Sequence, residues 1–149
     1  MADLYDTDFY AWTQKQAALL KQNHWAELDL PNLIEEIESL GRQEQRELRN
    51  RLGLVLGHLL KWQYQPTNRS NSWRATLREQ RTQARLLLEE NPSLKPYLAE
   101  VMMVAYQLAQ DLAVRETGLD YTTLPAECPY SLIQALDDGF SPIDYGGWG

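Results

Sequence analysis

The sequence predicts an all-α protein, a single-domain helical bundle of five to six helices with a short C-terminal helix and tail. Apolar residues recur with a period near 3.6 along most of the chain, which is typical of amphipathic helices. β-Branched residues are sparse, and strand-like alternation is missing outside those stretches. A length of 149 residues fits one domain. We therefore expect one domain over residues 1–149, with a mobile tail from about residue 140.

The first two predicted helices have recognisable starts. The first follows Asp6-Thr7-Asp8, which offers capping oxygens, and runs to about Asn23 with apolar positions at Phe9, Trp12, Ala17 and Leu20. The second starts after Asp29, with Pro31 in its first turn, and we expect its core face to consist of Leu33, Ile37 and Leu40. Gly41 is expected to end or bend it.

The third predicted helix, from about Arg42 to Gln65, has the clearest apolar repeat and is expected to be central. Its core positions are Leu48, Leu52, Val55, Leu56, Leu59 and Leu60. Gly53 and Gly57 lie four residues apart, so a neighbouring helix can approach closely, although each glycine costs about 1 kcal/mol in helix propensity.

Three further helices are predicted after the turn that contains Pro66. One spans 73–90, with its cap at Ser70, Asn71 or Ser72, and ends before Asn91-Pro92. The next is capped by Ser93 and stops at Gly118. The segment CPYSLIQALDDGF is expected to form a short helix, and the tail IDYGGWG to be partly mobile.

The net charge of −7 hides an uneven distribution of charge. Residues 42–85 hold ten basic side chains against three acidic ones, a net +7, so the rest of the chain carries −14. Either the acidic ends neutralise the basic middle within the fold, or the middle faces an anionic partner.

Four polar residues lie on or beside faces that should be apolar: Glu36, His58, Gln80 and Arg81. Half-buried ionised groups need partners, so we expect Glu36 and Arg81 to pair with each other or with His58. One interpretation is a structural network that fixes helix register. The other is a polar pocket, with Glu36 and His58 as acid/base candidates, Arg81 holding an anion, and Gln80 as a fourth candidate catalytic residue.

A basic stripe on the fourth predicted helix is the second candidate site. Arginines recur there at Arg74, Arg78, Arg81 and Arg85, and the candidate anion-binding set also includes Lys61, Arg69, Trp62 and Trp73. The alternative is that both tryptophans belong to the core and that acidic neighbours neutralise the stripe. No metal site and no cofactor is expected, because Glu-x-x-His pairs, glycine-rich phosphate loops and nucleophile motifs are missing from the sequence.

The expected location is the cytoplasm, with no membrane association. A single cysteine, Cys128, cannot form an intramolecular disulfide and favours a reducing compartment. The start of the sequence is acidic and lacks the apolar run of a signal peptide, and no run of about 20 apolar residues predicts a membrane span.

The segments NLIEEIESLG, HLLKWQYQP and RSNSWR, together with similar stretches over almost the whole chain, resemble the cyanobacterial "domain of unknown function 29" family. The resemblance implies a small, single-domain helical protein without an established activity. It supplies no catalytic residues.

We interpret the chain as an interaction or regulatory protein with a basic, aromatic-edged surface, rather than as an enzyme. A protein partner or a homodimer is expected before nucleic acid. Two alternatives stay open: an enzyme acting on a nucleic acid or phosphorylated ligand at a Glu36, His58 and Arg81 pocket, or a nucleic-acid-binding module.

Overall fold

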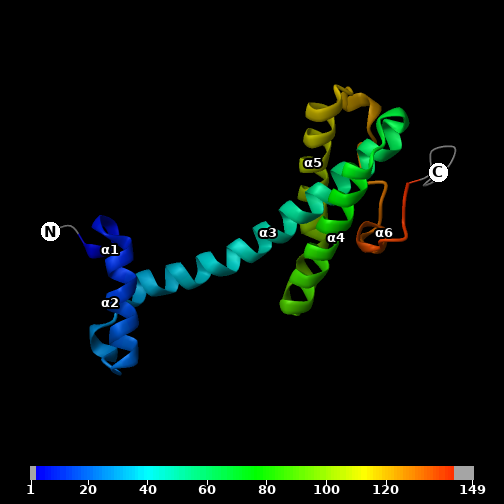
Figure 1. Ribbon diagram of the computed structural model, residues 1–149. Helices are drawn as coiled ribbons and strands as arrows, with labels where there is room; N and C mark the ends of the chain where they lie inside the picture. Colours follow the sequence, from blue (N-terminus) through cyan, green and yellow to red (C-terminus); the bar gives the residue numbers. More distant parts are fainter. Residues whose placement is uncertain (1–2, 143–149) are drawn as a thin grey trace. The chain divides into compact units, whose positions relative to one another are not determined.

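The computed structural model describes residues 3–142 and shows an α-helical chain with no strand among them (Figure 1). Its α-helices are α1 Leu4–Thr7, α2 Phe9–Lys21, α3 Leu30–Tyr64, α4 Asn71–Glu90, α5 Leu98–Thr117 and α6 Leu132–Leu136. The all-α fold class with a short C-terminal helix is confirmed. The expected mobile tail lies almost entirely outside the described residues.

The chain divides into two compact units, an amino-terminal unit Met1–Gln43 and a carboxyl-terminal unit Glu44–Gly149. That residues 1–149 form one domain stays a prediction.

The amino-terminal unit is fixed by a polar network between α2 and the start of α3. The Trp12 indole donates to the Asp29 carboxylate at 2.9 Å, and the backbone N–H of Asp29 donates to the buried side chain of Gln16 at 2.9 Å. The Asp29 carboxylate also accepts from the side chain of Asn32 at 2.8 Å, which lowers the pKa of Asp29. Asp29 therefore orders the first turn of α3, as its position before Pro31 predicts.

Gly41 does not end a helix, because α3 runs through it for 35 residues. A helical glycine costs only about 1 kcal/mol, and nothing in the surrounding sequence supplies a turn. The predicted core face is wrong in part. Ile37 and Leu40 are exposed, and only Leu33 is half-buried.

The core of the carboxyl-terminal unit forms around the second half of α3, and its predicted positions Leu48, Leu52, Val55, Leu56, Leu59 and Leu60 are fully buried. Gly53 and Gly57 face α5: a Cβ at Gly53 would lie 3.3 Å from the Leu108 Cβ, and one at Gly57 would lie 2.6 Å from the Leu112 Cδ2. The predicted close helix approach is confirmed.

Helix ends in this unit follow local sequence at two places and depart from it at a third. Ser70 caps α4 by accepting from the N–H of Trp73, and Gly118 ends α5 in the left-handed conformation with φ of 75°. Ser93 caps no α-helix, because a 3₁₀ segment, Pro92–Tyr97, precedes α5.

In the amino-terminal unit, two of the apolar positions predicted on the first helix, Phe9 and Leu20, are exposed.

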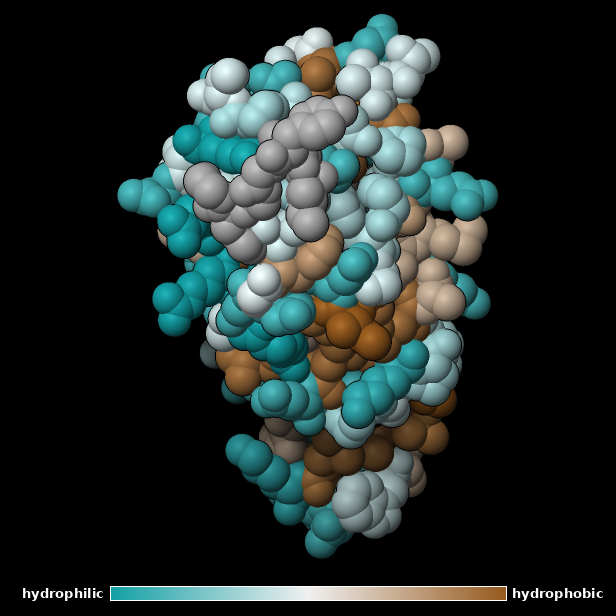
Figure 2. Space-filling model, turned by 90° about the vertical axis from the view of Figure 1, so that its right-hand side faces the viewer, coloured by the Kyte–Doolittle hydropathy of each residue, from teal (hydrophilic) through white to brown (hydrophobic). Residues whose placement is uncertain are grey.

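The surface of the carboxyl-terminal unit is mixed in character. On the face where α6 lies, hydrophobic residues are exposed among hydrophilic ones (Figure 2). Ile133 of α6 is 79% exposed and lies far in sequence from the exposed apolar residues of α3.

Candidate anion-binding groove

Arg81 of α4 is the most deeply buried charged side chain among residues 3–142, with 1% of its surface exposed. Its Nε donates to the carbonyl oxygen of Ala135 at 2.8 Å, and its Nη2 donates to the carbonyls of Gln134 and Phe140, each at 3.1 Å. The guanidinium is therefore held by three neutral acceptors instead of a carboxylate.

The reason for this arrangement is the shortness of α6. The last carbonyls of a helix lack partners within it, and arginines near the end can bind them. Arg85, one turn along α4, adds a 2.7 Å bond to the carbonyl of Leu136. The two arginines thus cap α6 and fasten the segment 134–140 to α4.

Arg81 keeps its positive charge without a directly bonded anion. Burial lowers its pKa, and Asp138 and Asp137 oppose that effect at longer range. An arginine side chain nevertheless stays protonated at neutral pH. Its Nη1 makes no hydrogen bond to any residue of the described part of the chain.

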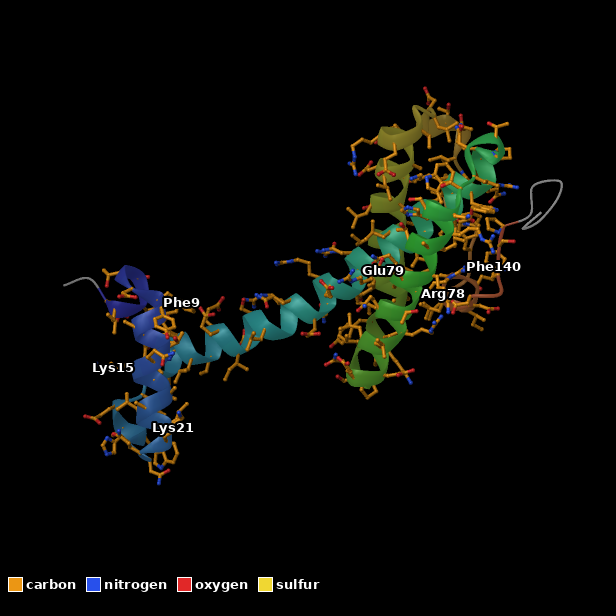
Figure 3. All side chains as sticks on the ribbon, viewed as in Figure 1. Phe9, Lys15, Lys21, Arg78, Glu79 and Phe140 are labelled. Atoms are coloured by element: carbon orange, nitrogen blue, oxygen red, sulfur yellow. The ribbon has the colours of Figure 1, made fainter. Side chains whose placement is uncertain are left out.

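A groove of about 470 Å³ opens beside this guanidinium. It is lined by Asn71, Arg74, Ala75, Leu77, Arg78, Arg81, Asp138 and Gly139. Arg78 is exposed, and its side chain forms no hydrogen bond or ion pair with a residue in 3–142. Figure 3 labels Arg78 together with Phe140 of the segment that Arg81 holds. The groove therefore joins a fixed cation from the core to an exposed one.

Asp138, at the edge of the groove, is already engaged. Its carboxylate accepts two bonds from Nη1 and Nη2 of Arg85, at 3.2 and 3.0 Å, and these bonds are the main reason why its pKa is lowered. Within the basic stripe, Arg85 is therefore paired with the carboxylate of Asp138, whereas Arg81 bonds only to backbone carbonyls.

His58, Gln80 and Arg81 all lie in the carboxyl-terminal unit, and within residues 44–142 they do not bond to one another. Glu36 accepts a 2.5 Å bond from the Tyr5 hydroxyl within the amino-terminal unit, and Gln80 accepts from Arg51 at 3.0 Å. Arg81 and His58 are therefore not paired with each other, and the expected pairing of Glu36 with either residue stays a prediction, because Glu36 belongs to the other unit.

His58 is buried on α3, where its Nδ1–H donates to the carbonyl of Leu54 at 2.8 Å. Burial is the main cause of its lowered pKa, so the ring is neutral near pH 7. A neutral, backbone-bonded histidine is the common structural use of this side chain.

The aromatic members of the predicted surface serve the fold. Trp62 is only 3% exposed, and Arg69 donates from Nε to its carbonyl at 2.8 Å and lies over its ring. Lys61 is buried in an ion pair with Glu116 at 2.6 Å, and its Nζ lies 4.5 Å from the ring centre of Trp73. Trp62 is therefore covered and cannot stack on bases, and Lys61 already has its counter-ion.

Two further observations concern residues 3–142. No group of three or more histidine, cysteine, aspartate or glutamate side chains is arranged to hold a metal ion. No helix combines the length and the apolar character that crossing a bilayer requires.

The family model described as domain of unknown function DUF29 matches residues 4–141, which cover most of each unit and every lining residue of the groove. The chain belongs to the DUF29 family. No curated protein and no solved structure is similar enough to add an activity to this assignment. The DUF29 groove must therefore be interpreted from its own geometry.

Sequence reasoning missed the acceptors that define this DUF29 site. The backbone carbonyls of Gln134, Ala135 and Phe140 carry no signal in residue type, and they lie more than 50 positions from Arg81. The single available clue is the pair Asp137-Asp138 at the end of the short helix, which matches the positive charge of the stripe.

Proposed function

We propose that this DUF29 chain is a small interaction protein that binds an acidic segment of a protein partner in the groove on α4. The observation that supports this most is the position of Arg81. Its buried guanidinium is fixed by three backbone carbonyls, and its Nη1 forms no hydrogen bond to a residue within 3–142. A fixed arginine loses little side-chain entropy on binding a carboxylate.

The spacing of the stripe suits a linear acidic segment. Arg78 and Arg81 are three residues apart on one helix face, which corresponds to about 4.5 Å along the axis. Carboxylates of a short peptide can reach both cations, and the groove of about 470 Å³ has room for only a few side chains. An acidic residue of the chain itself, Asp138, already uses the same chemistry on Arg85.

Nucleic acid is the weaker partner for this surface. The chain has a net charge of −7, which repels a polyanion at long range, and the ring of Trp62 is covered. Catalysis by Glu36, His58 and Arg81 is also less well supported, because Glu36 is bonded to Tyr5 and His58 to its own helix.

The biological setting is part of the proposal. The resemblance that the sequence carries supports a cyanobacterial source, and the lone Cys128 supports a reducing, cytoplasmic compartment.

The experiment compares Arg78→Gln with Arg46→Gln. Both remove one exposed arginine, but Arg46 lies on α3 outside the groove. The probe is a fluorescein-labelled hexaglutamate peptide, followed by anisotropy. Since a charged hydrogen bond contributes roughly 1.5–3 kcal/mol, we expect Arg78→Gln to weaken binding about tenfold or more. Arg46→Gln should bind within about twofold of the wild type.

An oligothymidylate of equal charge tests the other class of partner. If Arg78→Gln and Arg46→Gln lose equal affinity for the peptide, its binding depends only on net charge. That result would contradict binding in the groove. Tighter binding of the oligonucleotide than of the peptide, with affinity falling steeply as salt rises, would overturn the choice of a protein partner.

A further inference from the structure

The first half of α3 carries four large apolar residues on one face: Leu30, Ile34, Ile37 and Leu40, which we call the α3 stripe. Their exposed fractions are 54%, 54%, 66% and 62%. Spacings of four, three and three residues place them along one side of a helix. Contiguous apolar surface of this kind on a soluble domain marks an interaction site.

The neighbouring helices α1 and α2 do not cover the stripe, because they are held on another side of α3. Tyr5 bonds to Glu36 at 2.5 Å, and Trp12 bonds to Asp29 at 2.9 Å. At about 100° per residue, Asp29 lies about 85°, Glu36 about 105° and Asn32 about 145° from the centre of the stripe. The polar network therefore fixes α1 and α2 and leaves the stripe open.

The surroundings of the stripe are acidic. Residues 1–43 contain eight Asp and Glu against three Lys and Arg, a net −5. Two of the basic residues, Lys15 and Lys21, lie on α2 (Figure 3). The third, Arg42, is already shared between Glu35 at 2.9 Å and Glu38 at 3.9 Å. An occupant of the stripe must therefore bring apolar and basic groups together.

A second copy of the chain meets only the first requirement. Pairing two copies stripe to stripe sets Glu38 beside the glutamates that flank the stripe of the other copy, Glu36 and Glu38. Like charges brought together across an interface oppose association. An amphipathic helix with lysine or arginine beside its apolar face meets both requirements.

We propose that the α3 stripe, with Glu38 on its border, binds a basic amphipathic helix of another protein. The partner would lay its apolar face along Leu30, Ile34, Ile37 and Leu40, the helix-in-groove mode in which anchors recur at helical spacing. Its cations would compete with Arg42 for Glu38. This surface is separate from the arginine groove and binds ligands of the opposite charge.

The test uses a synthetic helix of about 18 residues made of leucine and lysine, long enough to be helical when bound. Binding is followed by anisotropy of a labelled peptide. The variants are Ile37→Asp in the stripe and Ile133→Asp on α6, where the isoleucine is also highly exposed. Both add one negative charge, so a non-specific attraction to the basic peptide rises equally in both.

We expect Ile37→Asp to weaken peptide binding about tenfold, because it removes an apolar anchor, and Ile133→Asp to leave it unchanged or slightly tighter. Ile34→Asp repeats the result at a second position of the stripe. Circular dichroism should show the wild-type helix content for all three. A peptide in which glutamate replaces lysine should bind much more weakly than the leucine-lysine peptide.

Equal binding of the leucine-lysine peptide to the wild type and Ile37→Asp overturns the proposal. So does a dimer, seen by light scattering on a sizing column, that Ile37→Asp converts to monomer, because it assigns the stripe to a second copy.

Discussion

The two halves of α3 have similar apolar patterns and opposite surroundings. Leu30, Ile34, Ile37 and Leu40 are exposed, whereas Leu48, Leu52, Leu56 and Leu59 are fully buried. The two glycines differ in the same way: nothing lies within 4 Å of a Cβ at Gly41, but one at Gly57 would meet Leu112. Helical periodicity therefore identifies a face that needs a partner, and does not say whether the same chain supplies it.

The difference has a physical cause in what faces each half. In the second half, Gly53 and Gly57 remove side-chain bulk, so the backbone of α5 at Ala105 can come within van der Waals contact. In the first half, α1 and α2 are held by side-chain hydrogen bonds to Asp29 and Glu36 instead of by the apolar stripe. One half is closed by packing, and the other is bordered by polar anchors.

The largest expected effect is on stability: truncating a leucine should destabilise the protein in the second half of α3 but not in the first. Leu56→Ala removes a fully buried side chain and should lower the free energy of unfolding by about 2–5 kcal/mol. Leu40→Ala should change it by less than about 0.5 kcal/mol, because Leu40 is mostly in water. Urea denaturation followed by circular dichroism measures both. If Leu40→Ala costs as much as Leu56→Ala, the stripe is covered in solution and the comparison fails.

Replacing a glycine of α3 by alanine should change the free energy of unfolding by a smaller amount, and in opposite directions in the two halves. Gly41→Ala should stabilise the protein by about 1 kcal/mol, since alanine is the better helix former and the added methyl meets nothing. Gly57→Ala gains the same propensity but forces the buried Leu112 to move, and overpacking costs about 1–3 kcal/mol. We expect a net loss of about 1 kcal/mol. Thermal and urea unfolding of the two variants should shift in opposite directions.

The sequence was a good guide to features that depend on neighbouring residues. The buried repeat from Leu48 to Leu60, the glycine strip, the Ser70 cap and the Gly118 stop all follow from local chemistry. The continuity of α3 through Gly41 does not, because a glycine is compatible with a turn and with a helix, and the difference is only about 1 kcal/mol.

The candidate site was harder to predict because its partners are remote and mostly backbone. Periodicity found that Arg81 lies on a face that should be apolar, but its acceptors are carbonyls of residues 134, 135 and 140. Likewise, Glu36 was recognised as needing a partner, and the partner is Tyr5, 31 residues earlier. The pattern thus identifies which polar groups need partners, and only tertiary structure supplies them.

The smallest effect concerns the polar anchor beside the stripe and appears only at high pH. The bond to Glu36 raises the pKa of Tyr5 from 10.0 to about 12. A tyrosine whose folded pKa is raised stabilises the fold fully below its unfolded pKa, and that contribution disappears as the pH rises through about 12. Glu36→Gln replaces the carboxylate with a neutral amide, so the Tyr5 pKa should fall toward 10. Absorbance at the tyrosinate wavelength, with Tyr5→Phe to assign the transition, measures the change. If the transition of Glu36→Gln matches that of the wild type, Glu36 does not hold Tyr5, and the amino-terminal half of α3 lacks the anchor that keeps α1 away from the stripe.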